Sequence, residues 1–243
     1  MAEERAGPSR QAPASAIRNL TYDMLDALGR EIVTGGYDGR RFPTEAELAA
    51  EYAVSRSVTR EAVKMLTAKG LLTARRRKGT TVQPAGCWNL FDPDVLRWLL
   101  ERKFSMELLR QFSELRFAIE PAAAALAASA ADDAARARIA AGYARMEAAE
   151  GGEGDPLEAD IAFHVAILEA SANPFFVQFR DVVTTALQTS IRFTNRFNGR
   201  TASLPCHRAV LDAIEARDGA RAHAAMAAII GNVMDLFAGG RAA

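Results

Sequence analysis

The sequence predicts a mainly α-helical protein with two domains, a small N-terminal one that ends in a β-hairpin and a larger one made only of helices. The chain has 243 residues and 49% of them are hydrophobic, which is enough for two modest cores. Strand-like residues are confined to the stretch 71–82. Beyond residue 93, apolar residues recur at helical spacing with no competing strand alternation.

The first helix is expected over residues 17–35, where an apolar stripe recurs every four residues and two glycines end the pattern. The stripe consists of Leu20, Met24, Leu28 and Ile32. A second helix follows Pro43 and is expected to end near Ala53. Thr44 can act as its N-cap, because a threonine hydroxyl accepts from a free N–H group of the first turn.

The third helix is expected to begin after Ser55 or Ser57, either of which can cap it, and to end at Gly70 after Lys69. This helix and the turn that follows it are strongly basic. Between residues 55 and 78 there are eight Lys and Arg residues against one acid. Phosphate groups attract such a concentration of positive charge, so this stretch favours nucleic-acid binding.

Two short strands, 71–74 and 80–82, are expected on either side of a basic turn in which Gly79 can adopt a positive φ angle. Three helices followed by a hairpin make a winged helix-turn-helix, which we place at residues 17–84. The preceding residues 1–16 are rich in Ala, Pro, Ser, Glu and Arg, so they are predicted to form a disordered tail.

The remainder of the chain is expected to form a linker with a connecting helix, 85–103, and then an antiparallel all-helical bundle, 104–238. The connecting helix begins near Pro93. Gly, Asn-Pro, Asn-Gly and Asp-Gly breaks separate the bundle helices. These helices are expected near 105–129, 132–149, 156–171, 174–197, 203–216 and 219–238. The Ala-rich stretch 122–145 indicates close helix packing.

Charge is unevenly distributed along the chain, although the net charge is zero. Residues 17–84 hold 12 Lys and Arg against 8 Asp and Glu, a net of +4, whereas residues 85–243 have a net of −4. Only the first domain is therefore expected to touch nucleic acid. Cys87 and Cys206 lack metal-ribbon spacing, and the chain contains neither a signal peptide nor a membrane-length apolar run. These features predict a reduced, cytoplasmic protein without a membrane span.

The third helix is predicted to be the recognition helix in the major groove of DNA. Arg56 and Arg60 share one face and can each bond a guanine edge through two donors. Ser55 and Ser57, at the start of the helix, suit phosphate contacts. The wing residues expected to reach the backbone or the minor groove are Arg76, Arg77, Lys78 and Gly79. The alternative is a solvated basic helix with ordinary surface charges.

Several segments resemble GntR-type bacterial transcription regulators. Their winged helix is similar to this chain at Pro43–Leu48, Val54–Ala62, Lys69–Leu72 and Lys78–Val82. The helical effector domain of their FadR subgroup, called FCD, resembles the segments Glu114–Pro121, Glu158–Leu168 and His207–Ile214. The resemblance extends over about residues 17–238. Within the subgroup, Trp88–Trp98 is similar to members that control sugar-acid catabolism, for example of galactonate.

The resemblance implies a homodimeric regulator, a repressor in our interpretation, that binds a pseudo-palindromic DNA operator and is released by a small carboxylate effector. A sugar acid, an aldonate such as galactonate, is the leading effector class. The subgroup's namesake also uses an Arg of the second helix to contact DNA, and Ala46 occupies that position here. The operator sequence therefore cannot be borrowed from the namesake.

Asp160, His164 and His207 are the candidate metal ligands, because the resemblance implies that His164 and His207 lie at metal-ligand positions of the family. The three residues are also expected to line the effector pocket. Asp160 and His164 are four residues apart and thus share a helix face. A carboxylate with imidazoles suits a divalent transition metal, with zinc the leading choice. The resemblance implies a further His on the last helix, where this chain has Ile229, and Asn232 one turn beyond could lend a polar group. A metal-free polar pocket and two ordinary core histidines remain alternatives.

Arg116 is a candidate clamp for the effector carboxylate, because it lies among apolar residues of its helix and a buried Arg needs an anionic partner. The alternative is an ion pair with Glu120, one turn along the helix. Gln188 and Arg192 share a face of another helix and could reach sugar hydroxyls. His223 is assigned to the surface, because its direction differs from that of Ile229 by about 240° round the helix.

Three other functions are alternatives. A metal-dependent hydrolase or lyase built on Asp160, His164 and His207 would have no convincing general base and no use for the basic domain. An architectural DNA binder would use the helical domain only for dimerisation. A regulator of the same family could respond to lactate, another hydroxy acid or a dicarboxylate. The first rival predicts that the chain is an enzyme, and we expect that it is not.

Overall fold

The computed structural model describes residues 14–75, 79–102, 105–197 and 203–239. The chain divides into two compact units, Met1–Arg102 and Lys103–Ala243, hereafter the head unit and the helical unit. The fold class is confirmed, because the described residues are mainly helical and form one sheet of two strands. No described helix is both long and apolar enough to cross a membrane.

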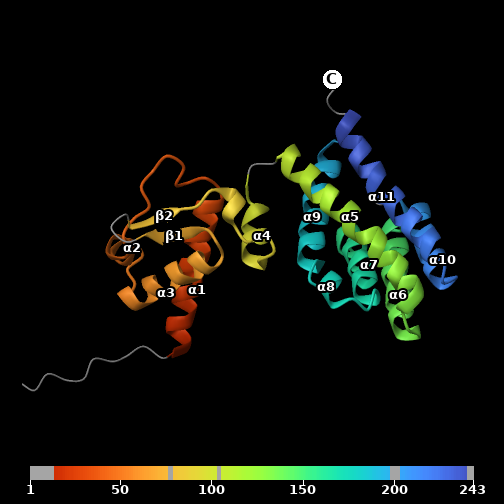
Figure 1. Cartoon of the computed structure of the whole chain (residues 1–243), viewed down its shortest axis with the longest axis horizontal. Coiled ribbons are helices and arrows are strands. Elements are labelled where there is room, and N and C mark those ends of the chain that lie inside the picture. Colours follow the sequence, from red (N-terminus) through yellow and green to blue (C-terminus); the bar gives the residue numbers. More distant parts are fainter. Residues whose placement is uncertain (1–13, 76–78, 103–104, 198–202, 240–243) are drawn as a thin grey trace, which may run out of the picture. The chain divides into compact units, whose positions relative to one another are not determined.

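The head unit has the predicted winged helix-turn-helix order (Figure 1). Its first elements are α1 (Ala14–Val33), α2 (Glu45–Glu51), α3 (Arg56–Ala68), β1 (Leu72–Arg75) and β2 (Gly79–Val82). The strands are antiparallel, and Leu72 pairs with Val82 and Arg75 with Gly79. Gly79 has a φ angle of +76°, which accounts for a glycine at the end of the turn.

The starts of α2 and α3 are fixed by local hydrogen bonds that the sequence predicts. Thr44 and Glu47 form a reciprocal capping box: the Thr44 hydroxyl accepts from Glu47 N–H, and the Glu47 carboxylate accepts from Thr44 N–H. Ser55 caps α3 by accepting from the N–H of Val58. Ser55, rather than Ser57, is therefore the cap residue.

Apolar residues of α1, α2, α3 and the hairpin build the core of the head unit. Leu28, Leu48, Leu66 and Leu71 have no exposed surface. The α1 stripe predicted from the sequence is buried from Met24 onward, but Leu20 is 44% exposed because its neighbour Thr21 faces the core instead.

Residues after the hairpin also pack on the head unit. They form η1 (Ala85–Cys87), a 3₁₀ turn, and α4 (Pro93–Leu99), capped by Asp92. Trp98 of α4 is fully buried against α1, where Gly29 leaves room for the indole and Asp26 accepts from its Nε1 at 2.8 Å. Lys69, at the end of α3, bonds Asp92 at 2.8 Å. The segment predicted to connect the domains is thus fastened to the head unit.

The helical unit is a bundle in which α5 packs along α11, α6 along α7, and α10 beside α11 (Figure 1). Its described helices are α5 (Met106–Ala130), α6 (Asp133–Glu150), α7 (Pro156–Ala170), α8 (Pro174–Val177), α9 (Arg180–Phe197), α10 (Leu204–Glu215) and α11 (Gly219–Gly239). Small residues allow the close packing that the Ala-rich stretch predicts. At Gly142 of α6, an added Cβ would lie only 2.9 Å from Phe163 Cα of α7.

One element of the bundle differs from the prediction. The sequence predicts a single helix over 174–197, whereas the structure has α8 and α9 with a break between them. Phe179 N–H bonds the Phe176 carbonyl in a tight turn, and Val183 N–H then bonds the Phe179 carbonyl as α9 begins. No Gly or Pro marks this break, so the sequence carried no signal for it.

Candidate functional site

The exposed face of α3 carries the residues predicted to contact DNA. Ser55, Arg56, Ser57 and Arg60 are all exposed, whereas the opposite face of the helix packs into the core. Burial of Val58, Ala62 and Leu66 on that inner face fixes the direction in which the arginines point. The helix therefore offers two arginine side chains, one turn apart, to the solvent.

The side chains on this face also contact one another. Arg60 Nε lies 3.5 Å from Glu45 Oε2 of α2, in an exposed ion pair that contributes little to stability. The hydroxyls of Ser55 and Ser57 are 2.9 Å apart. Gly79 is exposed at the start of β2. The predicted wing residues Arg76, Arg77 and Lys78 lie outside the described residues.

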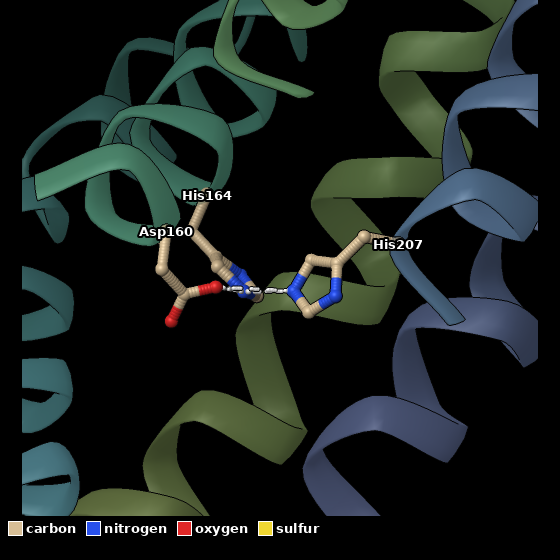
Figure 2. A group of neighbouring side chains, drawn as sticks. All are labelled: Asp160, His164 and His207. Carbon is tan, nitrogen blue, oxygen red and sulfur yellow. Dashed lines mark hydrogen bonds and ion pairs between the residues drawn. The ribbon is translucent and has the colours of Figure 1, made fainter. Parts of the chain in front are cut away.

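In the helical unit, Asp160, His164 and His207 converge on one point, as Figure 2 shows. Asp160 and His164 come from adjacent turns of α7, and His207 comes from α10. Their donor atoms form a triangle: Asp160 Oδ1 is 3.1 Å from His207 Nε2 and 3.6 Å from His164 Nε2, and the two Nε2 atoms are 3.3 Å apart. All three side chains are buried.

The hydrogen bonds on the far side of each imidazole determine which nitrogen faces this triangle. His207 Nδ1 lies 2.8 Å from the Ser203 carbonyl, and His164 Nδ1 lies 2.5 Å from Glu120 Oε2. Both partners are acceptors, so each Nδ1 must carry the hydrogen and donate it. In the neutral rings, each Nε2 therefore presents a lone pair to the centre of the triangle, as metal-binding histidines do.

Asp160 supplies the third electron-pair donor of the triangle. Its Oδ1 is buried and has no hydrogen-bond donor among the described residues. Burial raises the pKa of Asp160, whereas His207 and His164, when protonated, and Arg116 lower it below the ordinary carboxyl value. With both histidines neutral, the Asp160 carboxylate faces two lone pairs, a costly buried arrangement that a cation would stabilise. The triad could hold a metal ion.

Arg116 has a different position from the one predicted for an effector clamp. Its guanidinium is buried and binds Glu120 of the same helix, with Nε 2.5 Å from Oε1 and Nη2 3.3 Å from Oε2. The ion pair that the sequence analysis kept as the alternative is therefore present. The guanidinium binds the Glu120 carboxylate, because a buried charge requires a nearby counter-charge.

Glu120 is the buried polar residue whose part in the site the sequence analysis missed. It bonds both Arg116 and, 44 residues away in sequence, His164. Burial raises the pKa of Glu120, but Arg116 and His164 outweigh it and hold the pKa well below the usual value. The spacing to Arg116 was visible in the sequence, but the contact between α5 and α7 was not.

The remaining predicted pocket residues are dispersed. Ile229 is buried in the core, and His223 is exposed as expected. Asn232 is also exposed, about 200° round α11 from the fully buried Ile230, and its role in the pocket stays a prediction. Gln188 is half-buried in α9. Arg192 lies in the same helix, in a part whose side chains are outside the described residues.

Each of the two units matches the model of a known protein family. A model of the gntR family of bacterial regulatory proteins matches residues 22–82, and a model of the FCD domain matches residues 111–232. The chain belongs to the GntR family. The GntR match covers the helix-turn-helix with its exposed arginines, and the FCD match covers the buried triad.

Individual relatives align over nearly the whole chain. The galactonate operon transcriptional repressor of Escherichia coli is 36% identical over 87% of this chain and 94% of its own length. The HTH-type transcriptional regulator LutR of Bacillus subtilis is 30% identical over 83% of this chain and 93% of its own. The solved structure of E. coli McbR/YncC covers 91% of this chain and 98% of its own, with 16% identity and a TM-score of 0.51, which supports the fold alone.

This GntR chain is a transcription regulator rather than an enzyme, since its domains and relatives belong to that class. The GntR domain implies DNA binding, and the FCD domain implies a small-molecule effector. The predicted family, fold class and general function are thus confirmed.

Proposed function

We propose that this regulator represses an operon of sugar-acid catabolism and is released from its operator by a small carboxylate bound in the helical unit. The head unit would bind DNA through Ser55, Arg56, Ser57 and Arg60. Two copies of the chain would bind a pseudo-palindromic site as a homodimer. The converging donors of Asp160, His164 and His207 carry the effector half of this proposal.

We assign a divalent metal ion, zinc in the first place, to the triad. In a tetrahedral zinc site, bonds of about 2.0–2.1 Å separate neighbouring ligand atoms by roughly 3.3–3.4 Å. The three separations here, 3.1, 3.3 and 3.6 Å, bracket that value. With neutral histidines, the buried charges of Arg116, Glu120 and Asp160 sum to one negative charge, which attracts a dication.

A three-ligand site leaves room in the metal's coordination sphere for the effector. Ile229 is apolar and supplies no fourth ligand. When bound, the metal would act as a Lewis acid toward oxygen ligands. A metal dication turns the buried negative charge into a positive one, which favours a carboxylate. Gln188 and Arg192 of α9 would bind the effector's hydroxyl groups.

The chemistry of the site favours a 2-hydroxy carboxylate, which can present a carboxylate and a neighbouring hydroxyl to one metal ion. Galactonate has this group, and one relative is named for the galactonate operon. A second candidate is a smaller hydroxy acid such as lactate, because another E. coli relative, 32% identical, is named a putative L-lactate dehydrogenase operon regulatory protein. A dicarboxylate is a third possibility for the same site.

Thermal unfolding of the purified protein against aldonates, hydroxy acids and dicarboxylates, each with and without chelator, tests the proposal. A ligand that binds the native state raises the unfolding midpoint. We expect one sugar acid to raise the midpoint and chelator to abolish that rise. A rise that survives chelator would contradict the metal, and no rise with any sugar acid would contradict the effector class.

A further inference from the structure

We propose that Glu120, held in place by Arg116, positions the imidazole of His164 for metal binding, so that α5 supports the metal centre without contributing a ligand. The inference rests on the proposed metal centre and goes beyond it. Glu120 is only 1% exposed and binds side chains of two helices. Oε1 binds Arg116 Nε, and Oε2 binds His164 Nδ1, each at 2.5 Å.

The contact with His164 sets both the direction and the tautomer of that ring. An imidazole on α7 alone can rotate about its side-chain bonds and can carry its hydrogen on either nitrogen. Donation from Nδ1 to the Glu120 carboxylate removes both freedoms. The lone pair of Nε2 is then directed at Asp160 Oδ1 and His207 Nε2, in the triangle of Figure 2.

The two histidines of the triad are supported by different acceptors. His207 donates from Nδ1 to the backbone carbonyl of Ser203, a neutral acceptor one turn earlier in chain order. His164 donates to a side-chain carboxylate on another helix. A carboxylate behind an imidazole makes the ring a stronger metal ligand, and loss of such a partner typically lowers metal affinity about 10–100-fold.

Arg116 gives Glu120 this role by holding its carboxylate in place. The guanidinium contacts both carboxylate oxygens, which fixes the plane of the carboxylate toward His164. The positive charge of Arg116 acts on Asp160 as well as on Glu120.

Metal titration of the full-length protein and four α5 variants tests the inference. Glu120→Gln removes the charge but preserves the shape. Because this change leaves Arg116 buried without its counter-charge and can unfold the unit, a second variant combines Arg116→Met with Glu120→Gln. The matched control is Glu114→Gln, which neutralises an exposed glutamate of the same helix that binds Arg110. Each protein is stripped of metal and titrated with Zn²⁺ against a chromophoric chelator, and with Co²⁺ by visible absorption.

We expect the wild type and Glu114→Gln to bind Zn²⁺ equally, and both Glu120 variants to bind it about 10–100-fold more weakly with an altered Co²⁺ spectrum. Arg116→Lys, which keeps the counter-charge, is expected to retain most of the affinity. Circular dichroism of the metal-free proteins separates loss of positioning from loss of fold. Wild-type affinity and spectrum in a folded Glu120 variant would overturn the inference. Absence of Zn²⁺ binding by the wild type would overturn the metal centre itself.

Discussion

Arg60 lies on the exposed face of α3, one turn after Arg56, with only an exposed ion pair to Glu45. Replacement by Ala should leave folding intact and weaken specific operator binding by about 1–3 kcal/mol, because a base contact is lost. Fluorescence anisotropy with a labelled operator measures this. Arg138→Ala, an exposed change on α6, should leave affinity unaltered. Equal losses in both variants would argue against a base-reading role for Arg60.

His207 supplies one of three donors to the proposed metal centre. His207→Ala should therefore abolish measurable Zn²⁺ binding at micromolar metal, because two donors rarely retain zinc in competition with water. His223→Ala on α11 is the control, since that histidine is exposed. Isothermal titration calorimetry distinguishes the two variants. Retained zinc binding in His207→Ala would show that the metal lies elsewhere.

Part of this site was predictable from sequence, because Asp160 and His164 occupy one helix and helical spacing alone places them on one face. The resemblance to a family then added His207. Glu120 was recognised only as an ion-pair partner, because its contact with His164 depends on how α5 crosses α7. The part of Asn232 in the pocket stays a prediction. Its direction was judged from Ile229, whereas the buried side of α11 is centred on Met226 and Ile230.

At the scale of elements, helix starts were predicted well because caps are local. Thr44 and Ser55 mark the starts of α2 and α3 through hydrogen bonds within one turn, and Asn173 with Pro174 marks the start of α8. The break after α8 lacks such a signal, since ordinary residues form it. The packing of α4 on α1 was also not predictable, because the Trp98–Asp26 bond joins residues 72 apart.

The contact between α6 and α7 depends on Gly142. An added Cβ would lie 2.9 Å from Phe163 Cα, so Gly142→Ala should push the helices apart and destabilise the protein by about 1–3 kcal/mol. Gly231→Ala on α11 meets nothing within 4 Å, and should be neutral or stabilising by up to about 1 kcal/mol. Thermal unfolding of both variants gives the comparison. A stabilising Gly142→Ala would mean that helix propensity outweighs the clash.

Asp26 connects α1 to α4 by accepting from Trp98 and Arg97. Burial acts to raise the pKa of Asp26, but these two partners and Arg30 lower it overall. A depressed pKa means that the carboxylate adds stability above its unfolded pKa of about 3.9, and that this stability is lost as pH falls through the folded value.

Asp26→Asn should accordingly cost on the order of 1 kcal/mol at neutral pH, with a difference from the wild type that narrows below about pH 4. Denaturant unfolding as a function of pH measures this difference. The control is Asp23→Asn, an exposed change on the same helix. A difference that persists unchanged to pH 2 would exclude the charge of Asp26 as its cause.

At the scale of the whole molecule, the division after Arg102 predicts how fragments behave. A fragment of residues 1–102 should fold and keep the operator's sequence preference, but with lower affinity because paired heads no longer act together. It should respond to no effector. A fragment of residues 1–84 should be less stable, because it lacks Trp98 and leaves its binding surface on α1 exposed. Unfolding curves of equal midpoint for the two fragments would contradict this.

The full-length protein is expected to couple its two sites by linkage. An effector weakens operator binding only as far as it prefers the unbound arrangement, and operator DNA must weaken effector binding by the same factor. Operator titrations with saturating galactonate, and galactonate titrations with saturating operator, should therefore give matching ratios.

The fastening of α4 has a mechanical consequence. Lys69 anchors the start of this helix to the end of α3, and Trp98 and Glu101 anchor its other end to Asp26 and Arg30 of α1. A pull on the chain beyond Arg102 would therefore not be absorbed by unwinding of α4. Tension would instead move α3 together with α1 and α4 as one rigid body.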